Sequence, residues 1–207
     1  MTRPSCVLTP STDEGPYFVD ERLLRSDIRA DAAGSTPEEG VPLSLAVRAV
    51  DARGDCPPVE GAHVDIWHCN AYGIYSDERA EKTIGRTFLR GCQVTGADGS
   101  VRFTTIFPGW YAGRAVHVHL KVRLLRDEQV TYDFTTQLFF DEDVIHEIHT
   151  GRSPYDTRGR PQVSNADDYI YRVDGPDLTV PLTAERGGGY RGSIVIGLDG
   201  LDAASTR

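Results

Sequence analysis

The sequence lacks any hydrophobic run long enough to cross a membrane. It also lacks a basic stripe, because 22 Lys and Arg are outnumbered by 31 Asp and Glu, which gives a formal net charge of −9. A general nucleic-acid binder carries an excess of positive charge along one face. These absences argue against DNA, RNA and anionic membranes as partners. They do not exclude a small anionic substrate, which responds to the local field of its pocket.

Cysteine is scarce, and the four cysteines lack the paired C-x-x-C spacing of a structural zinc site. They are Cys6, Cys56, Cys69 and Cys92. Their even number is consistent with disulfides as well as with buried thiols, and spacing does not determine the pairing. The N-terminal segment lacks the apolar core of a signal peptide. The location therefore stays open: cytoplasmic as the sequence stands, or secreted if a leader has been removed.

Long amphipathic helices are also missing, and short segments of alternating polarity take their place. We expect strands at 41–50, 62–68, 87–95, 100–107, 115–124, 134–140 and 190–198. The Asp-Gly pair at 98–99 predicts a hairpin between the third and fourth of these. We expect only two helical pieces, around 20–29 and 141–150, and a loop at 151–169.

Many short strands with closely spaced turns indicate an all-β fold, an antiparallel or mixed β-sandwich with few short helices. The length of 207 residues suits a single domain. Residues 1–40 are rich in Pro, Gly, Asp and Ser, and we expect them to form an extended arm that packs on the domain. Residues 41–207 would form the β-sandwich itself.

Two of the six histidines lie one residue apart, in a predicted strand. His117 and His119 would project from the same face, so their imidazoles could converge on one metal ion. The alternative is a solvent-exposed face, because Lys121 and Arg123 continue the alternation. The pair alone is a weak signal and leaves both interpretations open.

Three familiar catalytic patterns are absent around these histidines. A cupin needs a carboxylate about four residues after the second histidine, and none occurs before Asp127. His146 and His149 are one residue too close for the H-E-x-x-H of a zinc protease. The sequence has no G-x-S-x-G nucleophile elbow. Ordinary zinc or serine hydrolysis is thereby disfavoured.

The wider segment FPGWYAGRAVHVH, residues 107–119, resembles the metal-binding segment of the intradiol ring-cleavage dioxygenases. These iron(III) enzymes include the catechol 1,2- and protocatechuate 3,4-dioxygenases. Their Pro-Gly-x-Tyr is followed by an arginine three positions before a His-x-His pair. IWHCNAYGIYSD resembles their other ligand segment, in which a tyrosine follows a tryptophan by eight residues, as Tyr75 follows Trp67. IWHCN and TFLRG are most similar to a small single-domain actinobacterial and fungal subgroup, many of whose members are secreted.

The resemblance implies iron(III) as the cofactor, and a catechol and O2 as the substrates. The ligands that it implies are Tyr75, Tyr111, His117 and His119. Iron(III) is a hard cation that favours anionic oxygen donors, and a bound metal favours the phenolate form of tyrosine. Two phenolates therefore suit iron(III) better than zinc. The family cleaves the ring between the two hydroxyl-bearing carbons and forms a cis,cis-muconate-type diacid.

The resemblance also implies roles beyond metal binding. Tyr111 matches the ligand that leaves the metal when a catechol chelates it, and Arg114 would stabilise negative charge on the ring. Gln137, in TTQLFF, would orient the substrate or the oxygen species. Gly15, Pro16 and Tyr17, in TDEGPYF, match a segment that approaches the substrate.

A second interpretation is a binding module without catalysis. PPVEGAHVDIW and ADGSVRFTTIFPGWY also resemble the transthyretin-like and carboxypeptidase-regulatory-like β modules. That interpretation explains a sandwich but not Arg114, Gln137 or the histidine pair. The sequence leaves the identity of the catechol and the oligomeric state open, a homo-oligomer included.

Overall fold

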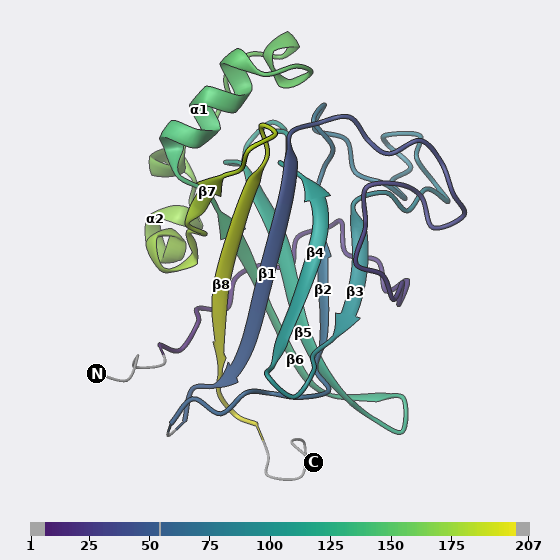
Figure 1. The fold of residues 1–207 in the computed structure, drawn as a ribbon, viewed down its shortest axis with the longest axis vertical. Coiled ribbons are helices and arrows are strands. Elements are labelled where there is room, and N and C mark those ends of the chain that lie inside the picture. The colour runs from purple at the N-terminus through teal and green to yellow at the C-terminus, as the bar shows by residue number, and fades with distance from the viewer. Residues whose placement is uncertain (1–6, 54, 202–207) are drawn as a thin grey trace.

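Two four-stranded sheets face each other in the computed structural model, which describes residues 7–53 and 55–201 (Figure 1). Their strand orders are β4-β1-β8-β7 and β3-β2-β5-β6. The strands are β1 (Pro42–Asp51), β2 (His63–Trp67), β3 (Arg90–Val94), β4 (Ser100–Ile106), β5 (His117–Arg126), β6 (Gln129–Phe139), β7 (Leu182–Ala184) and β8 (Tyr190–Leu198). The helices are α1 (Glu142–Gly151) and α2 (Tyr171–Asp174), with short 3-10 turns at Tyr155–Thr157, Asn165–Asp167 and Gly175–Leu178.

The predicted β-sandwich is confirmed, and of the two arrangements left open by the sequence it has the mixed one. β1 pairs with β8 in parallel, and the other strand pairs are antiparallel. Alternate residues of β1 and β5 fill the space between the sheets. These buried residues include Leu43, Leu45, Val47, Val118, Leu120 and Val122. Burying each such side chain contributes about 1.5–3 kcal/mol to the folding stability. The alternation of apolar and polar residues in these segments therefore largely specifies which face of each sheet is buried.

The predicted hairpin around Asp98-Gly99 is wrong. A turn does form there, closed by a hydrogen bond from Gly99 N to Gly96 O of 2.8 Å. However, β3 pairs with β2 and β4 pairs with β1, so the turn carries the chain from one sheet to the other. A turn sequence specifies a local reversal of the chain, whereas packing far along the sequence selects the partner strand.

The predicted helix at 20–29 is also wrong, because this part of the arm is extended. Backbone hydrogen bonds of 3.0 Å join Arg25 N to Cys92 O and Ile28 N to Thr104 O. The Ile28 side chain is fully buried against the sandwich. These tertiary contacts outweigh the local helix propensity of the segment.

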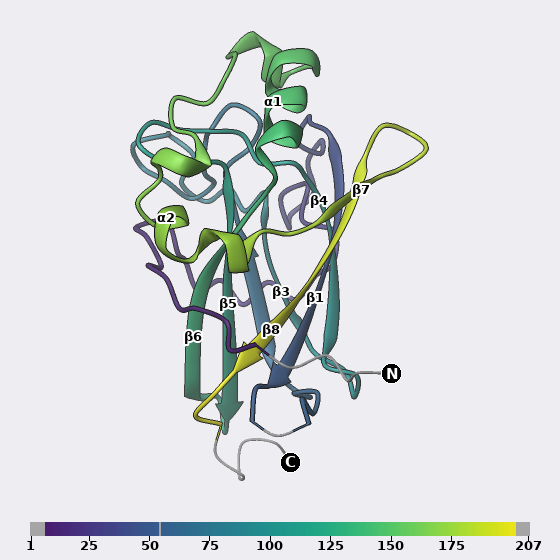
Figure 2. The same ribbon diagram turned by 90° about the vertical axis from the view of Figure 1, so that its left-hand side faces the viewer.

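The arm crosses the outer side of β5 and β6 (Figure 2). Glu14 forms an ion pair of 2.6 Å with Lys121, and Asp20 forms one of 2.9 Å with Arg123. The Phe18 ring lies 4.9 Å from Lys121 Nζ, a cation–π contact. The outer face of β5 is therefore covered and charged beneath the arm, and the solvent-face alternative for the histidine strand is wrong. The division into 1–40 and 41–207 stays a prediction.

The helices lie on one side of the sandwich (Figure 1). α1 forms where a helical turn was predicted, and the Asp141 side chain caps it by accepting from Asp143 N at 2.9 Å. No helix within the described part of the chain is long and apolar enough to cross a membrane. Cys56 is disulfide-bonded, whereas Cys69 and Cys92 are free and buried; Cys6 lies outside the described residues.

Candidate metal centre

Two imidazoles meet at the start of β5. The Nε2 atoms of His117 and His119 lie 3.1 Å apart. His117 Nδ1 lies 2.7 Å from the Ala115 carbonyl, which fixes Nδ1 as the protonated nitrogen and leaves the Nε2 lone pair free. Burial lowers the pKa of His117 to about 3 and that of His119 well below its usual value. Both rings are therefore neutral, which is the form that binds a metal.

Two phenols complete the group. Tyr111, on the loop before β5, places its hydroxyl oxygen 3.2 Å from His117 Nε2. Tyr75, on the loop after β2, packs edge-on against Tyr111 with ring centroids 5.6 Å apart. Burial raises the pKa of both phenols. Their ionisation would therefore require a cation beside the two oxygens.

These four side chains fit a hard metal ion. Two donors about 2.1 Å from one ion lie about 3 Å apart in neighbouring positions, and the 3.1 and 3.2 Å separations match that spacing. The Tyr75 hydroxyl is buried without a hydrogen-bond partner. No group of three His, Cys, Asp or Glu that could hold a metal occurs within 7–53 and 55–201. A metal at this position therefore needs the tyrosine oxygens.

His119 is held between an indole and the arm. The Trp67 ring stacks on it, with centroids 4.8 Å apart and planes within 6°. On the arm, Gly15 has φ +73°, and a Cβ there would lie 3.2 Å from His119 Cε1. Glycine is suited to this position, both for its left-handed backbone and for its lack of a side chain.

The rest of the predicted pocket segment also lies at the site. Tyr17 stacks on Tyr75 with centroids 4.3 Å apart and meets Tyr111 edge-on at 5.9 Å. Arg90 NH1 donates to the Tyr17 carbonyl at 2.6 Å and so fixes the arm there. Pro16 is exposed beside it. The arm thus forms one wall of the site.

Arg114 and Gln137, both predicted site residues, lie together: Arg114 NH2 donates to Gln137 Oε1 at 2.6 Å. The other end of the amide, Nε2, donates to the Asp13 carbonyl at 2.8 Å. Gln137 therefore links Arg114 to the arm. Sequence reasoning missed Asp168, which accepts from Arg114 Nε at 2.8 Å and is buried. No local pattern in the sequence marks Asp168, because its contact with Arg114 forms only in the folded chain.

Comparison with known proteins agrees with this geometry. A family model described as a dioxygenase matches residues 13–151, more than half of the chain. The intradiol ring-cleavage dioxygenase from Tetranychus urticae has the same fold, with a TM-score of 0.80 and 30% identity over 95% of this chain and 97% of its own. The chain belongs to the intradiol ring-cleavage dioxygenase family.

Curated members of this dioxygenase family are longer. Catechol 1,2-dioxygenase 1 of Acinetobacter lwoffii is 27% identical over 180 residues, which cover 87% of this chain and 55% of that protein. The hydroxyquinol 1,2-dioxygenase of Corynebacterium glutamicum is 29% identical over 101 residues, covering 48% of this chain and 31% of its own. The chain thus spans about half, or less, of the curated dioxygenases that it matches. The family match outweighs the interpretation as a non-catalytic β module.

Trp110 and His68 lie near the site but have structural surroundings. Trp110 is buried and donates from Nε1 to the Gly159 carbonyl at 3.0 Å. His68 is buried between the Cys69 carbonyl and Thr105 Oγ1, both at 2.8 Å. These contacts leave the ring nitrogens of His68 engaged away from the four donors.

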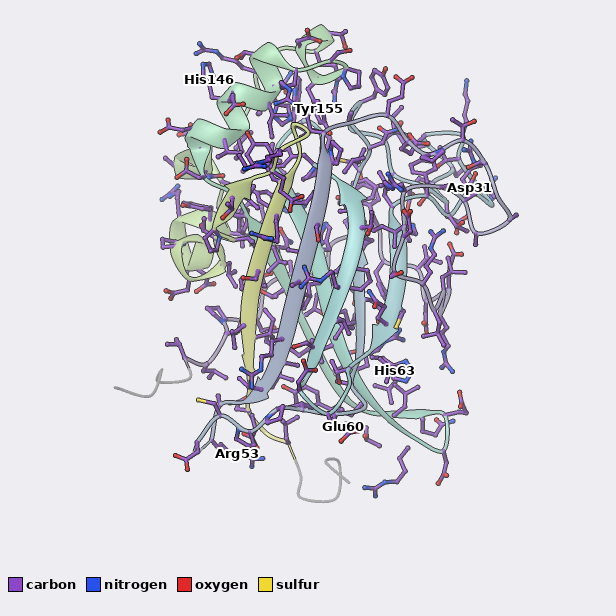
Figure 3. All side chains as sticks on the ribbon, in the orientation of Figure 1. Asp31, Arg53, Glu60, His63, His146 and Tyr155 are labelled. Atoms are coloured by element: carbon purple, nitrogen blue, oxygen red, sulfur yellow. The ribbon has the colours of Figure 1, made fainter. Side chains whose placement is uncertain are left out.

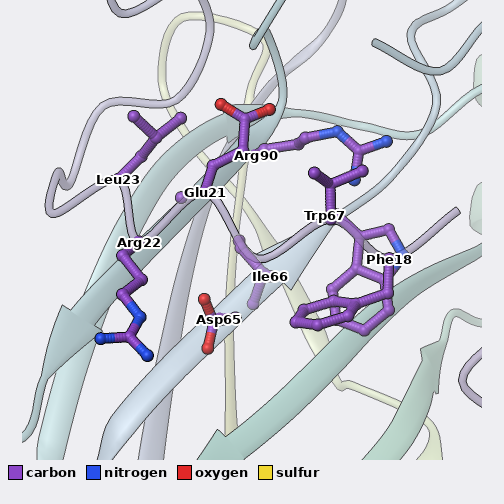
Figure 4. A pocket seen from close by; sticks show the side chains of 10 residues that line it. Phe18, Glu21, Arg22, Leu23, Asp65, Ile66, Trp67 and Arg90 are labelled. Carbon is purple, nitrogen blue, oxygen red and sulfur yellow. The ribbon is translucent and has the colours of Figure 1, made fainter. Parts of the chain in front are cut away.

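A small pocket lies between the arm and β2 (Figure 4). Its lining includes Phe18, Glu21, Asp65, Trp67 and Arg90. Its space is about 10 Å³, room for about one water molecule. The buried atoms Glu21 Oε1 and Trp67 Nε1 have no hydrogen-bond partner. The pocket is too small to hold an aromatic ring.

Proposed function

We propose that the protein is a non-haem iron(III) intradiol dioxygenase. It would cleave a catechol-type ring between the two hydroxyl-bearing carbons, incorporate both atoms of O2 and release a cis,cis-muconate-type diacid. The observation that carries this proposal is the convergence of three donors: His117 Nε2 lies 3.2 Å from Tyr111 Oη and 3.1 Å from His119 Nε2. The partnerless Tyr75 hydroxyl beside them supplies the fourth donor.

The donor set favours iron(III) over zinc. Tyr75 and Tyr111 would bind as phenolates, and His117 and His119 as neutral imidazoles. The chemistry that iron(III) supplies in such a site is chelation of the catecholate, which makes the ring itself reactive toward O2. The chain's own contribution is to hold the ligands, to move protons and to shield the ring.

Tyr111 is the ligand that we propose to leave when the catechol binds. It lies on a loop and is partly exposed, whereas Tyr75 and both histidines are buried. Its phenolate oxygen can accept a proton from a catechol hydroxyl as it is displaced. Because the free phenol has a raised pKa, the protonated form is favoured once the oxygen leaves the ion. Tyr111 would thereby remove one of the two catechol hydroxyl protons.

Arg114 would stabilise the negative charge that develops on the ring. Its guanidinium is positioned before substrate arrives, since Asp168 binds Nε at 2.8 Å and Gln137 binds NH2 at 2.6 Å. A preorganised cation needs no rearrangement during the reaction. Trp67 and the arm residue Tyr17 would shield the candidate metal centre from water.

The test uses protein purified aerobically after iron supplementation. We expect one iron per chain, a visible phenolate-to-iron charge-transfer band and a ferric EPR signal. Incubation with catechol should give the muconate, detected by mass spectrometry with both atoms from ¹⁸O2. Colourless, EPR-silent protein at full iron supplementation would refute the metal assignment. Yellow semialdehyde products would show cleavage beside the hydroxyls and refute the intradiol assignment.

A further inference from the structure

Arg114, the cation beside the candidate centre, is already engaged by protein groups. Asp168 takes its Nε at 2.8 Å and Gln137 takes its NH2 at 2.6 Å. The Tyr169 ring covers the guanidinium at 5.0 Å. Because Asp168 and Gln137 hold Nε and NH2, and a buried counter-ion is already in place, an external carboxylate would gain less from Arg114 than from an unpaired cation.

The other positive side chains around the site are engaged as well. Arg90 donates from Nε to Ser76 Oγ at 2.9 Å, from NH2 to the Ser76 carbonyl at 2.7 Å and from NH1 to the Tyr17 carbonyl at 2.6 Å. Lys121 is bound by Glu14 at 2.6 Å. These contacts hold the arm in place, so a substrate would have to break them to use either cation.

Carboxylate side chains lie on the segments that border the site. Asp13 is exposed on the arm, and its Oδ2 accepts from the Tyr169 hydroxyl at 3.3 Å. Glu78 and Glu81 follow Tyr75 on the same loop. Tyr169 adds an aromatic ring whose exposed fraction is 56%. Carboxylates beside an exposed aromatic ring suit a neutral or positively charged group.

We propose that this site selects catechols by the charge of the ring substituent. It favours neutral or cationic catechols and discriminates against carboxylated ones. A carboxylate on the ring would give up hydration without gaining a free cation, and it would lie near Asp13, Glu78 and Glu81. This inference rests on the proposed dioxygenase function and specifies its substrate class.

Three ring-substituted catechols of similar size test the proposal: 3,4-dihydroxybenzoate, 3,4-dihydroxybenzamide and 3,4-dihydroxybenzylamine. With the iron-loaded protein at pH 7.5 and low salt, we expect kcat/KM for the amide to exceed that for the benzoate about tenfold or more. The amine should match or exceed the amide. The gap should narrow in 0.5 M salt, because exposed charges are screened.

Equal kcat/KM for the benzoate and the amide would overturn the charge selection. Kd values for the same compounds, measured by calorimetry on the iron-loaded protein, give the same ratio without turnover. If no catechol is cleaved, the proposed function fails, while the Kd ratio still decides whether the site selects by charge.

Variants separate the rim charges from other causes of selectivity. Asp13→Asn, and Glu78→Gln combined with Glu81→Gln, should each reduce the amide-to-benzoate ratio about threefold or more. Glu60→Gln is the matched control. Trp67, at the site end of β2, pairs with His119, whereas His63, at the far end of β2, pairs with Arg123. Glu60 precedes His63, and Figure 3 shows Glu60 at the opposite end of the molecule from Tyr155. An unchanged ratio in both rim variants, with unchanged melting temperatures, would refute the electrostatic cause.

Discussion

Asp168 holds Arg114 through a 2.8 Å hydrogen bond to Nε, although the two residues are 54 positions apart. The same carboxylate accepts from the backbone of Ala115 at 2.9 Å and of Ile170 at 2.9 Å. Burial alone would raise the pKa of Asp168, but the hydrogen bonds, that from Arg114 first among them, outweigh it and lower the pKa. The carboxylate is therefore ionised at neutral pH, and it fixes the guanidinium beside the candidate metal centre.

Replacing this carboxylate should slow turnover without releasing the metal. Asp168→Asn removes a charge-assisted hydrogen bond worth about 1.5–3 kcal/mol, so we expect kcat to fall roughly 10- to 100-fold while KM changes little. The iron content and the visible band should stay unchanged. Asp167→Asn, at the exposed neighbour, is the control and should keep parental kcat. A parental kcat in Asp168→Asn would show that Arg114 needs no anchor.

Removing the tyrosine oxygens should change the metal site itself. Tyr75→Phe and Tyr111→Phe each delete one proposed phenolate, so each variant should bind less than half the parental iron after dialysis against a chelator, with a weaker visible band. The measurements are iron analysis and absorbance. Tyr72→Phe is the control, because this nearby tyrosine is exposed and lies outside the four donors. Parental iron content and colour in both single variants would contradict the ligand assignment.

The period of two in the sequence predicted seven of the eight strands and the face-sharing of His117 and His119, because burial of alternate residues is a local requirement. It missed the three-residue β7 and the start of β6. The alternating pattern did not predict which strands pair with each other, because β3 and β4 lie in different sheets. The extended course of residues 20–29 depends on contacts with distant strands, such as that of Ile28 with Thr104. Asp168 was missed for the same reason: its loop carries no periodic pattern, and only the folded chain brings it to Arg114.

The close passage of the arm over His119 makes Gly15 sensitive to substitution. Gly15→Ala adds a Cβ 3.2 Å from His119 Cε1, and the stacked Trp67 leaves that ring little freedom to move. We expect the arm to shift and KM for catechol to rise about tenfold. Kinetics and iron analysis measure the effect.

Gly34→Ala is the matched control for this prediction. Gly34 also has a positive φ, +89°, but a Cβ there would meet nothing within 4 Å. Both variants should lose about 1–2 kcal/mol of folding stability, the cost of a left-handed alanine. Only Gly15→Ala should change KM, and equal KM effects would show that backbone strain alone is responsible.

A buried histidine on α1 should make the folding stability dependent on pH. His149 packs against Phe107 and Tyr155, and burial lowers its pKa to about 4. In the unfolded chain the pKa is about 6.5. Between these values the unfolded chain binds a proton that the folded chain does not, so the free energy of unfolding should fall as the pH drops from about 6.5 to about 4. The slope approaches about 1.4 kcal/mol per pH unit for this one group.

Urea unfolding of the parent and of His149→Phe at pH 7.5, 6.0 and 5.0 measures this contribution. The phenyl ring keeps the aromatic packing but cannot titrate, so the loss of stability between pH 7.5 and 5.0 should be about 2 kcal/mol smaller in the variant. His146→Phe is the control for replacing a histidine of α1, because His146 is exposed on the same helix (Figure 3). The other titratable groups are the same in variant and parent, so their contributions cancel in the comparison. If the free energy of unfolding changed equally with pH in His149→Phe and the parent, His149 would be protonated equally in the folded and unfolded chains.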